Sequence, residues 1–458
     1  MSLADHPAPN PVVDIRGRHT RREFLRRAGL LSGAGLAMPW ALELASLANA
    51  TPVGADDGYR AIVCVFLYGG NDHADTFVPN DDIGYAAYAA ARGDIAHPLG
   101  TVRAITPRGG FRGAGTFGFA PELARLHDLF GRGDAAVVAN VGSLQRPLTK
   151  SEYAVVSNRP PQLFSHNDQQ SFWQAAAPEG ATTGWGGRIA DLLLDGNGAG
   201  ATFTCVSVSG NAVMMTGDDA LQYQVSPGGV TTLRRDLFRY DAMDDGLREL
   251  MELELPGMFP ESYVDTTRRA LAAADDLSSA IDTAAALHTL DEHFELDSAN
   301  NATSRLSAQL RMVARLIAAG RDVLGLRRQV FFVGLGGFDN HDGLVAEHRP
   351  LLSALDSGLA GFHAAMTAMG AGDQVTSFTA SDFGRTLVSN GDGTDHGWGG
   401  HHLVIGGAVA GNEVYGDVPV TADDGPDDVG RGRLLPTVSV DQYASTFAGW
   451  MGAGSSEL

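Results

Sequence analysis

The chain has 458 residues, with 33 basic and 54 acidic side chains and a formal net charge of −21. This excess of negative charge makes nucleic acid and anionic membrane surfaces poor partners, because both would repel the chain. The two cysteines, Cys64 and Cys205, lie in separate apolar runs, so the sequence excludes a disulfide framework and predicts two buried free thiols. Lys150 is the only lysine, which leaves P-loop and Schiff-base chemistry almost no residue to use.

The first 50 residues are typical of a twin-arginine export signal. The pair Arg21-Arg22 precedes a modestly apolar stretch, residues 28–42, that is too short to cross a bilayer as a helix. The stretch leads to Ala48-Asn49-Ala50, a small-x-small cleavage motif. We therefore expect a mature chain of residues 51–458 in the periplasm or outside the cell, with a net charge of about −23. A basic amphipathic N-terminal helix is the alternative.

Six apolar runs along the mature chain predict β-strands. They are rich in Val and Phe, apolar on both faces and separated by helix-length segments, as in a parallel sheet covered on both sides. The runs are residues 61–68, 135–142, 202–208, 328–335, 374–380 and 402–409. Helical periodicity is clear in residues 121–131, 185–196, 305–325 and 347–369. The pattern predicts an α/β fold with a mostly parallel central sheet sandwiched by helices.

The sequence shows no clean linker, so we expect one domain over residues 51–458. Residues 230–300 are rich in Ala, Leu and Asp and helical in pattern, which predicts a helical insertion packed over one edge of the sheet. No later segment of the mature chain has 18 uninterrupted apolar residues, so no transmembrane segment is expected there. The oligomeric state is not predictable from these patterns.

Acidic residues and histidines follow three of the strand-like runs and precede a fourth. Ligands of open α/β sheets bind at the carboxyl ends of the strands, so residues far apart in sequence can converge there. Carboxylates and neutral imidazoles are ordinary ligands of a divalent hydrolytic metal ion. The sequence therefore predicts one divalent metal site, with zinc as one candidate ion. Its predicted ligands are Asp72, Asp339, His341, Asp382, His396 and His401.

Several motifs of this chain resemble the DUF1501 family of exported bacterial proteins. They are the twin-arginine start, VFLYGGNDHADTFVP, LFSHNDQQSFWQ, SDFGRT and GTDHGWGGHH, and the resemblance covers nearly the whole mature chain. That family is similar to the alkaline phosphatase and sulfatase superfamily. The resemblance implies an alkaline-phosphatase-like fold with metal ligands at strand ends, and it implies no known substrate.

The resemblance also implies roles for individual residues. Asp72 resembles the acid after the first strand that holds one metal ion. Asp339 and His341 resemble the half-site of the other ion, which His396 or His401 would complete. Asp382 resembles the acid of an Asp-His pair, but here Phe383 follows it, and phenylalanine cannot bind metal. One metal position is therefore short of a ligand unless a late histidine fills it.

The residues themselves leave other interpretations open. Asp72 after Gly-Gly-Asn could be a turn residue. Asp382 could be the N-cap of a helix continuing through Leu387; Arg385 would then lie on the same face, either to clamp an anion or to form a surface ion pair. His348 could simply begin a helix. Alternation along a strand sends one of His401 and His402 inward and the other outward.

The nucleophile is the least defined part of the predicted site. Ser165 precedes a helix-like segment, where free N–H groups would stabilise an oxyanion, and it is the best candidate. Thr149 is a weaker candidate, and Ser165 could equally be a plain helix N-cap. His166 and Asp168 beside it are candidates for polar lining of the site.

Two function hypotheses follow. The first is an exported metal-dependent hydrolase acting on a phosphate or sulfate ester, either a small molecule or a polysaccharide, with Ser165 and Arg385 as catalytic residues. The second is a non-catalytic envelope binding protein that keeps the fold with a depleted metal site. The retained acids and histidines favour the hydrolase, whereas Phe383 and the missing clear nucleophile favour the binding protein.

Overall fold

A computed structural model describes residues 58–113, 115–230, 246, 258–296 and 301–453. The predicted signal peptide, residues 1–50, lies outside these residues. Within the described part of the chain, no helix combines the length and the apolar character needed to cross a membrane. Cys64 and Cys205 are both buried and free, which confirms the prediction of two unpaired thiols.

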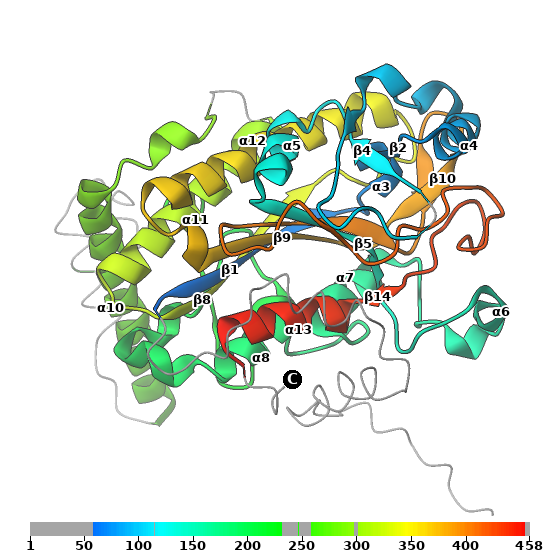
Figure 1. Ribbon diagram of the computed structural model, residues 1–458. Coiled ribbons are helices and arrows are strands. Elements are labelled where there is room, and N and C mark those ends of the chain that lie inside the picture. The colour runs from blue at the N-terminus through cyan, green and yellow to red at the C-terminus, as the bar shows by residue number, and fades with distance from the viewer. Residues whose placement is uncertain (1–57, 114, 231–245, 247–257, 297–300, 454–458) are drawn as a thin grey trace, which may run out of the picture.

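A nine-stranded sheet runs through the centre of the molecule in the order β13-β5-β12-β9-β1-β8-β6-β7, with β14 paired to β5 (Figure 1). Its pairings are parallel except those of β12, which is antiparallel to both β5 and β9. The longer strands are β1 (Arg60–Tyr68), β5 (Ala135–Gly142), β8 (Arg328–Gly336), β9 (Val375–Ser381) and β12 (Gly400–Ile405). The shorter ones are β6 (Cys205–Ser207), β7 (Gln222–Gln224), β13 (Val414–Tyr415) and β14 (Val438–Ser439). All six predicted strands and the mostly parallel sheet are confirmed.

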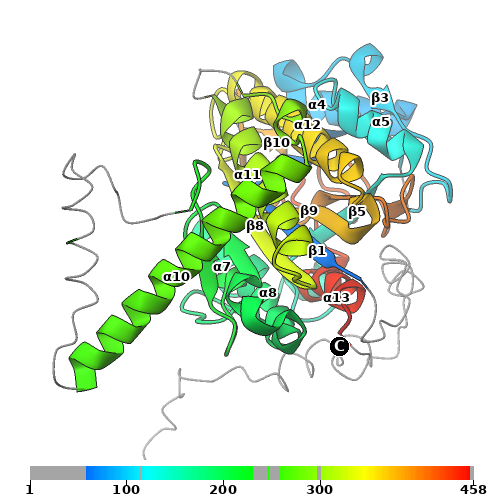
Figure 2. The same cartoon turned by 90° about the vertical axis from the view of Figure 1, so that its left-hand side faces the viewer.

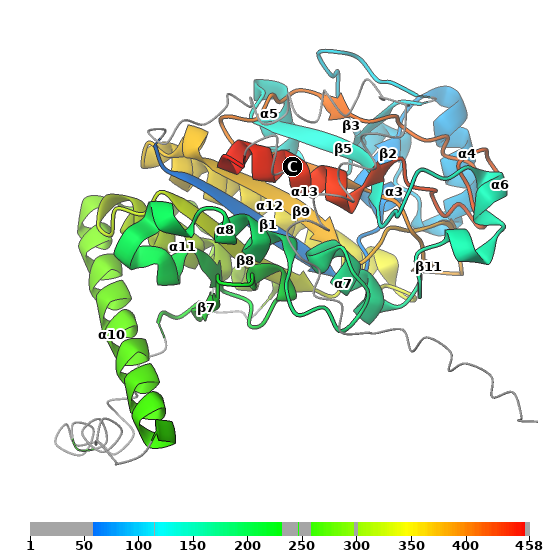
Figure 3. The same ribbon diagram turned by 90° about the horizontal axis from the view of Figure 1, so that it is seen from below.

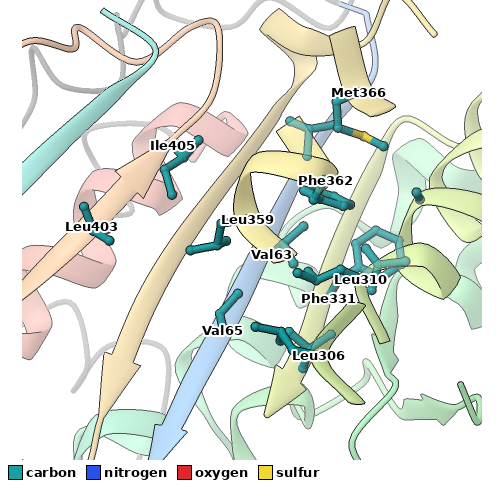
Figure 4. Packing of buried hydrophobic residues seen from close by; sticks show 14 of the residues in the cluster. Val63, Val65, Leu306, Leu310, Phe331, Leu359, Phe362, Met366, Leu403 and Ile405 are labelled. Carbon is teal, nitrogen blue, oxygen red and sulfur yellow. The ribbon is translucent and has the colours of Figure 1, made fainter. Parts of the chain in front are cut away.

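Each face of the sheet has its own apolar core. Along β1, Val63 and Val65 belong to one core, and Ile62 and Cys64 belong to the other. Figure 4 shows Val63 and Val65 facing Leu359 and Phe362 of a covering helix. Burial on both faces explains why these strands read as continuous apolar runs rather than as alternating ones.

Helices cover both faces of the sheet, as predicted. One face carries α5 (Ala124–Arg132), α11 (Ala302–Asp322) and α12 (Leu344–Ala368), and the other carries α7 (His166–Ala175), α8 (Trp185–Asp191) and α13 (Val440–Met451) (Figures 1 and 3). The predicted helix 185–196 ends early, because the chain continues as the 3-10 segment η4 (Leu194–Phe203), which is interrupted at Gly198. The sequence did not predict α13.

Part of the predicted insertion at 230–300 is described. Residues 231–245, 247–257 and 297–300 lie outside the described structure. The long helix α10 (Met258–Leu287) packs against α11 at one end and extends away from the body of the molecule (Figure 2). The domain boundaries therefore stay predictions.

Short elements surround the carboxyl ends of the strands. They are α3 (His73–Thr76), α4 (Asp82–Arg92), α6 (Lys150–Tyr153), β10 (Arg385–Ser389) and β11 (Thr394–His396), with a small sheet in the order β2 (Phe77–Pro79), β4 (Phe117–Phe119) and β3 (Arg103–Ala104). The alternative of a helix running from Asp382 through Leu387 is wrong, since this segment enters strand β10 and pairs with β11. Asp382 is therefore not a helix N-cap.

Candidate metal centre

Two glycines at the end of β1 allow two strand ends to come close together. Gly69 and Gly70 have φ angles of 114° and 91°, which side chains with a Cβ rarely adopt. A Cβ on Gly69 would lie 2.4 Å from the backbone nitrogen of Asp339. The chain after β1 therefore lies directly against the chain after β8, and the carboxyl ends of both strands contribute to one site.

Four side chains converge at this position, and we refer to His166, Asp339, His341 and His396 as the open cluster. One Asp339 oxygen, Oδ1, lies 3.1 Å from Nε2 of His341 and 3.1 Å from Nε2 of His396. The other, Oδ2, lies 3.4 Å from Nε2 of His166. The side chains of Asp339 and His341 are each 42% exposed, so solvent reaches the cluster. The side chains of Asp339 and His341 therefore point into the same cluster.

The outer nitrogens of the histidines show how each ring is oriented. Nδ1 of His396 lies 2.9 Å from the Phe164 carbonyl oxygen, which can only accept, so this nitrogen carries the proton. Nδ1 of His166 donates to the Asp382 carboxylate at 2.6 Å. Nδ1 of His341 lies 3.4 Å from an Asp395 oxygen. Such outer contacts are typical of metal-binding histidines, because they leave Nε2 free as the ligand.

The inner nitrogens then face one another. Nε2 of His341 and Nε2 of His396 are 3.0 Å apart. With both protons on Nδ1, two lone pairs would point at each other, so a cation or a proton must lie between them. Tetrahedral zinc with Zn–N bonds of about 2.0–2.1 Å places two nitrogens about 3.3 Å apart. One donor atom each from His166, Asp339 and His396 also lies within 4.8 Å of the others. The donor set therefore fits a divalent metal ion.

Buried neighbours fix the orientation of the cluster. Asp382 is fully buried and accepts from His166, from Nε2 of Gln170 at 2.9 Å and from the Gly69 amide at 3.2 Å. The hydrogen bond to Asp382 raises the pKa of His166. Phe383 lies with its ring centroid 4.6 Å from the ring of His396 and 5.0 Å from that of His166. Phe383 therefore packs beside the ligands rather than serving as one.

Arg385 is fully buried and has no nitrogen left for a ligand. Its Nη1 bonds Asp339 at 2.7 Å and the Gly69 carbonyl at 3.0 Å, while Nε and Nη2 bond Thr394. Burial alone would raise the pKa of Asp339, but the hydrogen bond and charge of Arg385 outweigh it and lower that pKa. The geometry makes Arg385 a residue that holds Asp339 in place.

A second polar cluster lies behind the first, and we refer to Asp72, Asp75, Arg92, His97 and His348 as the closed network. Asp72 receives both terminal nitrogens of Arg92 at 2.7 Å, and neither side chain is exposed. Asp75 lies 2.8 Å from His348 and 2.9 Å from His97. The five side chains pair with one another and none is exposed, although Nε of Arg92 and Oδ1 of Asp75 have no hydrogen-bond partner in the described residues. The structure therefore places Asp72 in a buried ion pair.

Asp72 also has a local role, as the turn interpretation suggested. It is the N-cap of α3, where its Oδ1 accepts the amides of Ala74 and Asp75 at 3.0 and 3.1 Å. Burial would raise the pKa of Asp72, but the charge and hydrogen bonds of Arg92 lower it to about 2. The Thr394 hydroxyl donates to Asp72 at 3.1 Å and accepts from Arg385 at 3.0 Å, so Thr394 and Arg385 together connect the closed network to Asp339 of the open cluster.

Two further predicted site residues, His401 and Ser165, are not members of the open cluster. His401 and His402 are consecutive on β12 and point to opposite faces, as alternation predicted: His401 packs on Phe117 and His402 on Trp173. Nδ1 of His401 accepts the Asn140 amide at 2.9 Å, so the structure does not bring this residue to the open cluster. Ser165 stands at the N-cap of α7, but its side chain makes no capping hydrogen bond.

Two residues that organise these clusters, His166 and Arg92, were not predicted in these positions from the sequence. His166 was expected as polar lining, and its place as a ring of the cluster depends on how α7 is docked. Arg92 gave no signal, because a basic residue in the last turn of a helix is ordinary. The sequence did place His166 at the start of a helix, next to the candidate nucleophile Ser165, and this position could have indicated a site residue.

Comparison with known proteins gives a family but no close relative. A family model described as "Protein of unknown function (DUF1501)" matches residues 59–430. A search of curated proteins gave no significant match. Among solved structures, the crystal structure of Ps i-CgsB in complex with k-i-k-neocarrahexaose is 14% identical with a TM-score of 0.34, over 87% of this chain and 73% of that one. The crystal structure of Ps i-CgsB gives 13% identity and the same TM-score of 0.34. Similarity this low supports no conclusion about substrate or reaction.

Proposed function

The chain belongs to the DUF1501 family, and we propose that it is an exported hydrolase whose open cluster holds a divalent metal ion and acts on phosphate or sulfate esters. The observation that carries the proposal is the pair of facing Nε2 atoms of His341 and His396, 3.0 Å apart, beside the carboxylate of Asp339. One shared proton would connect the two imidazoles alone, whereas a divalent ion would engage both of them together with the Asp339 carboxylate.

The metal ion would be held by His166, Asp339 and His396, with His341 as a further partner beside His396. When bound, such an ion polarises an ester oxygen and lowers the pKa of a bound water molecule. Neighbouring residues fix the orientation of two ligands: Asp382 orients the ring of His166, and the Phe164 carbonyl orients the ring of His396. The exposure of the cluster leaves room for a substrate to approach.

Arg433 is the residue we assign to the anionic group of the ester. Its Nε donates to the His396 carbonyl oxygen at 2.7 Å and its Nη1 to the Gly430 carbonyl at 3.1 Å. Its guanidinium carbon also lies 5.2 Å from the centroid of the Phe164 ring. These contacts hold the group at the edge of the cluster while Nη2 has no protein partner in the described residues. Guanidinium groups bind phosphate and sulfate oxygens well, and Arg385 is not available for this role.

Ser165 is proposed as the nucleophile. It lies one residue before His166 and is half-buried, and its hydroxyl makes no capping bond. The amides at the start of the ten-residue helix α7 would favour negative charge developing nearby.

Metal content and turnover test the proposal together. The purified full chain, never exposed to chelator, should contain at least one divalent ion and hydrolyse an aryl phosphate or an aryl sulfate. His396→Ala should lose both. The matched control is His127→Ala, since His127 is a partly exposed histidine on α5 whose Nε2 bonds the Ala104 carbonyl. A metal-free wild-type protein would contradict the proposal.

A non-catalytic binding protein is the second candidate, and two observations favour it. Phe383 takes a position where a metal-binding imidazole would be expected, and Arg92 occupies the carboxylate of Asp72. A chain that binds one metal ion but turns over neither class of ester would support this alternative.

A further inference from the structure

Arg431 lies in a turn whose backbone favours glycine. Its φ angle is 60°, and its neighbours Gly430 and Gly432 have φ angles of 124° and 71°. Residues with a Cβ adopt this left-handed conformation at a cost, although Asn and Asp tolerate it better than most. Of the five other non-glycine residues with positive φ in the described chain, three are Asn or Asp. An arginine at this position therefore indicates that its side chain has a role of its own.

The conformation of the turn is imposed by its pairing with β10. The Val388 amide donates to the Arg431 carbonyl at 3.2 Å, and the Leu387 amide donates to the Gly432 carbonyl at 3.3 Å. A Cβ on Gly432 would lie 2.3 Å from the Cβ of Leu387. At position 431 the pairing uses backbone atoms alone, so glycine would satisfy it there equally well.

The side chain of Arg431 reaches the carboxylate of Asp395. Its Nη1 lies 2.9 Å from Oδ2 of Asp395, and its Nη2 donates to the Ser389 carbonyl at 3.3 Å. Nδ2 of Asn390 donates to Oδ1 of Asp395 at 2.9 Å, and the Asp395 amide donates to the Thr386 hydroxyl at 3.0 Å. Arg431 and Asn390 thus hold one carboxylate oxygen each.

Asp395 in turn lies behind His341 of the open cluster. Its Oδ1 is 3.4 Å from Nδ1 of His341, while Nε2 of that ring points at His396 and Asp339, at 3.0 and 3.1 Å. Because 3.4 Å exceeds a normal hydrogen-bond length, the attraction is mainly electrostatic and depends on where the carboxylate is held. A carboxylate at the outer nitrogen of a histidine keeps the proton there and leaves Nε2 free as a metal ligand.

The same turn also supports the next residue of β11. Nε of Arg433 donates to the His396 carbonyl at 2.7 Å. The two arginines of one turn therefore contact two consecutive residues, Asp395 and His396, and each contact leads to a different histidine of the open cluster.

We propose that Arg431 is a positioning residue of the metal centre. It fixes the carboxylate of Asp395, and Asp395 holds the ring of His341 with Nε2 directed at the ion. The inference rests on the function proposed above, since it assumes that the open cluster holds a divalent ion. It adds a residue that touches neither the ion nor the substrate but sets the affinity for the ion.

Zinc affinity of the purified full chain, measured by competition with a chromophoric chelator, tests the proposal. Arg431→Gly removes the side chain and suits the backbone, so zinc affinity should fall about tenfold. The urea midpoint of the metal-free chain should change little, because the side chain is 46% exposed and exposed ion pairs contribute little to stability. Arg431→Lys keeps the positive charge and should lose less affinity than Arg431→Gly.

The matched control is Asp424→Gly. Asp424 also has a positive φ, of 58°, and its exposed carboxylate lies 3.3 Å from Nζ of Lys150. This variant makes the same kind of backbone change in another turn and should leave zinc affinity unchanged. Arg431→Met keeps the apolar stem without the charge and replaces Arg431→Gly if the glycine variant does not fold.

A double variant tests whether Arg431 acts through Asp395. Asp395→Asn should itself weaken zinc binding about tenfold, and adding Arg431→Gly should cause no further loss, since both changes act on one carboxylate. Losses that add fully would overturn the proposed path, and so would a wild type and an Arg431→Gly variant that bind zinc equally well. A wild type that binds no zinc would instead overturn the proposed function, and this inference with it.

Discussion

The open cluster and the closed network both combine aspartate and histidine at the same end of one sheet, yet they differ in exposure and in the partners of their side chains. In the closed network, Asp72 and Arg92 are fully buried and bind each other through two hydrogen bonds. In the open cluster, Asp339 and His341 are each 42% exposed, and imidazole nitrogens face each other. Residue type alone therefore does not distinguish the two regions; access to solvent and the arrangement of the imidazole nitrogens do.

The largest effect should come from breaking the closed network. Arg92→Met leaves the Asp72 carboxylate buried without a counter-ion, which should lower the free energy of unfolding by about 3–5 kcal/mol. Urea denaturation measures it. The matched control is Arg125→Met, because the Arg125–Glu295 pair is half exposed and should contribute about 0–1 kcal/mol. Equal losses in both variants would mean that burial does not distinguish the two regions.

Metal-dependent stabilisation should separate the two acids. With metal ion at about 100 times its dissociation constant, the wild type should gain about 2.7 kcal/mol of stability, and Asp339→Asn should lose most of this gain. Asp72→Asn should be less stable overall but should keep the gain. Thermal unfolding with and without added zinc measures both. If Asp72→Asn also lost the stabilisation by metal, Asp72 would be a metal ligand, and the distinction between the closed network and the open cluster would be wrong.

Acid should weaken the closed network over a defined pH range. The pKa of Asp72 is lowered to about 2 in the folded chain, whereas an unfolded aspartate has a pKa of about 3.9. The contribution is therefore complete above about pH 4 and is lost as the pH falls toward 2, on the order of 2–3 kcal/mol. The difference in stability between wild type and Arg92→Met should shrink across that range. A difference that stays constant would contradict the assignment.

The smallest effect on stability is expected at Ser165. Its side chain makes no capping hydrogen bond, so Ser165→Ala should cost less than about 0.5 kcal/mol. If Ser165 is the nucleophile, the same variant should lose turnover while it keeps its metal ion. Thr149→Ala is the comparison, because Thr149 caps α6 through a capping box and should cost about 1 kcal/mol without affecting turnover. Full activity in Ser165→Ala would show that Ser165 is not the nucleophile and would favour direct attack of a water molecule on the ester.

The fold was accessible from the sequence because its strands are long, apolar and buried on both faces. Each of the six runs became a strand, and His401 and His402 point to opposite faces as their alternation predicted. The short elements gave no comparable signal: β10 has five residues, and it forms because β11 pairs with it. The local pattern after Asp382 is also compatible with a helix, so the choice between helix and strand depends on pairing with β11.

The site was accessible only in part, for a related reason. A motif shows which residues follow a strand, but not which partner each one meets. Asp72 meets Arg92, twenty positions away, and His401 turns toward Phe117. His166 reaches the open cluster from another element altogether. Such pairings depend on how helices are docked, and single-sequence periodicity does not contain that information.

Gly69 is not one of the proposed metal ligands, yet the distances between those ligands depend on it. With a φ of 114° and the Asp339 nitrogen 2.4 Å from where a Cβ would stand, even alanine would push the ends of β1 and β8 apart. The carbonyl of Gly69 also receives Arg385, and its amide bonds Asp382. The mutational tolerance of the site is thus set by backbone separation as much as by ligand chemistry: a variant could retain every proposed ligand and still have the wrong distances between them.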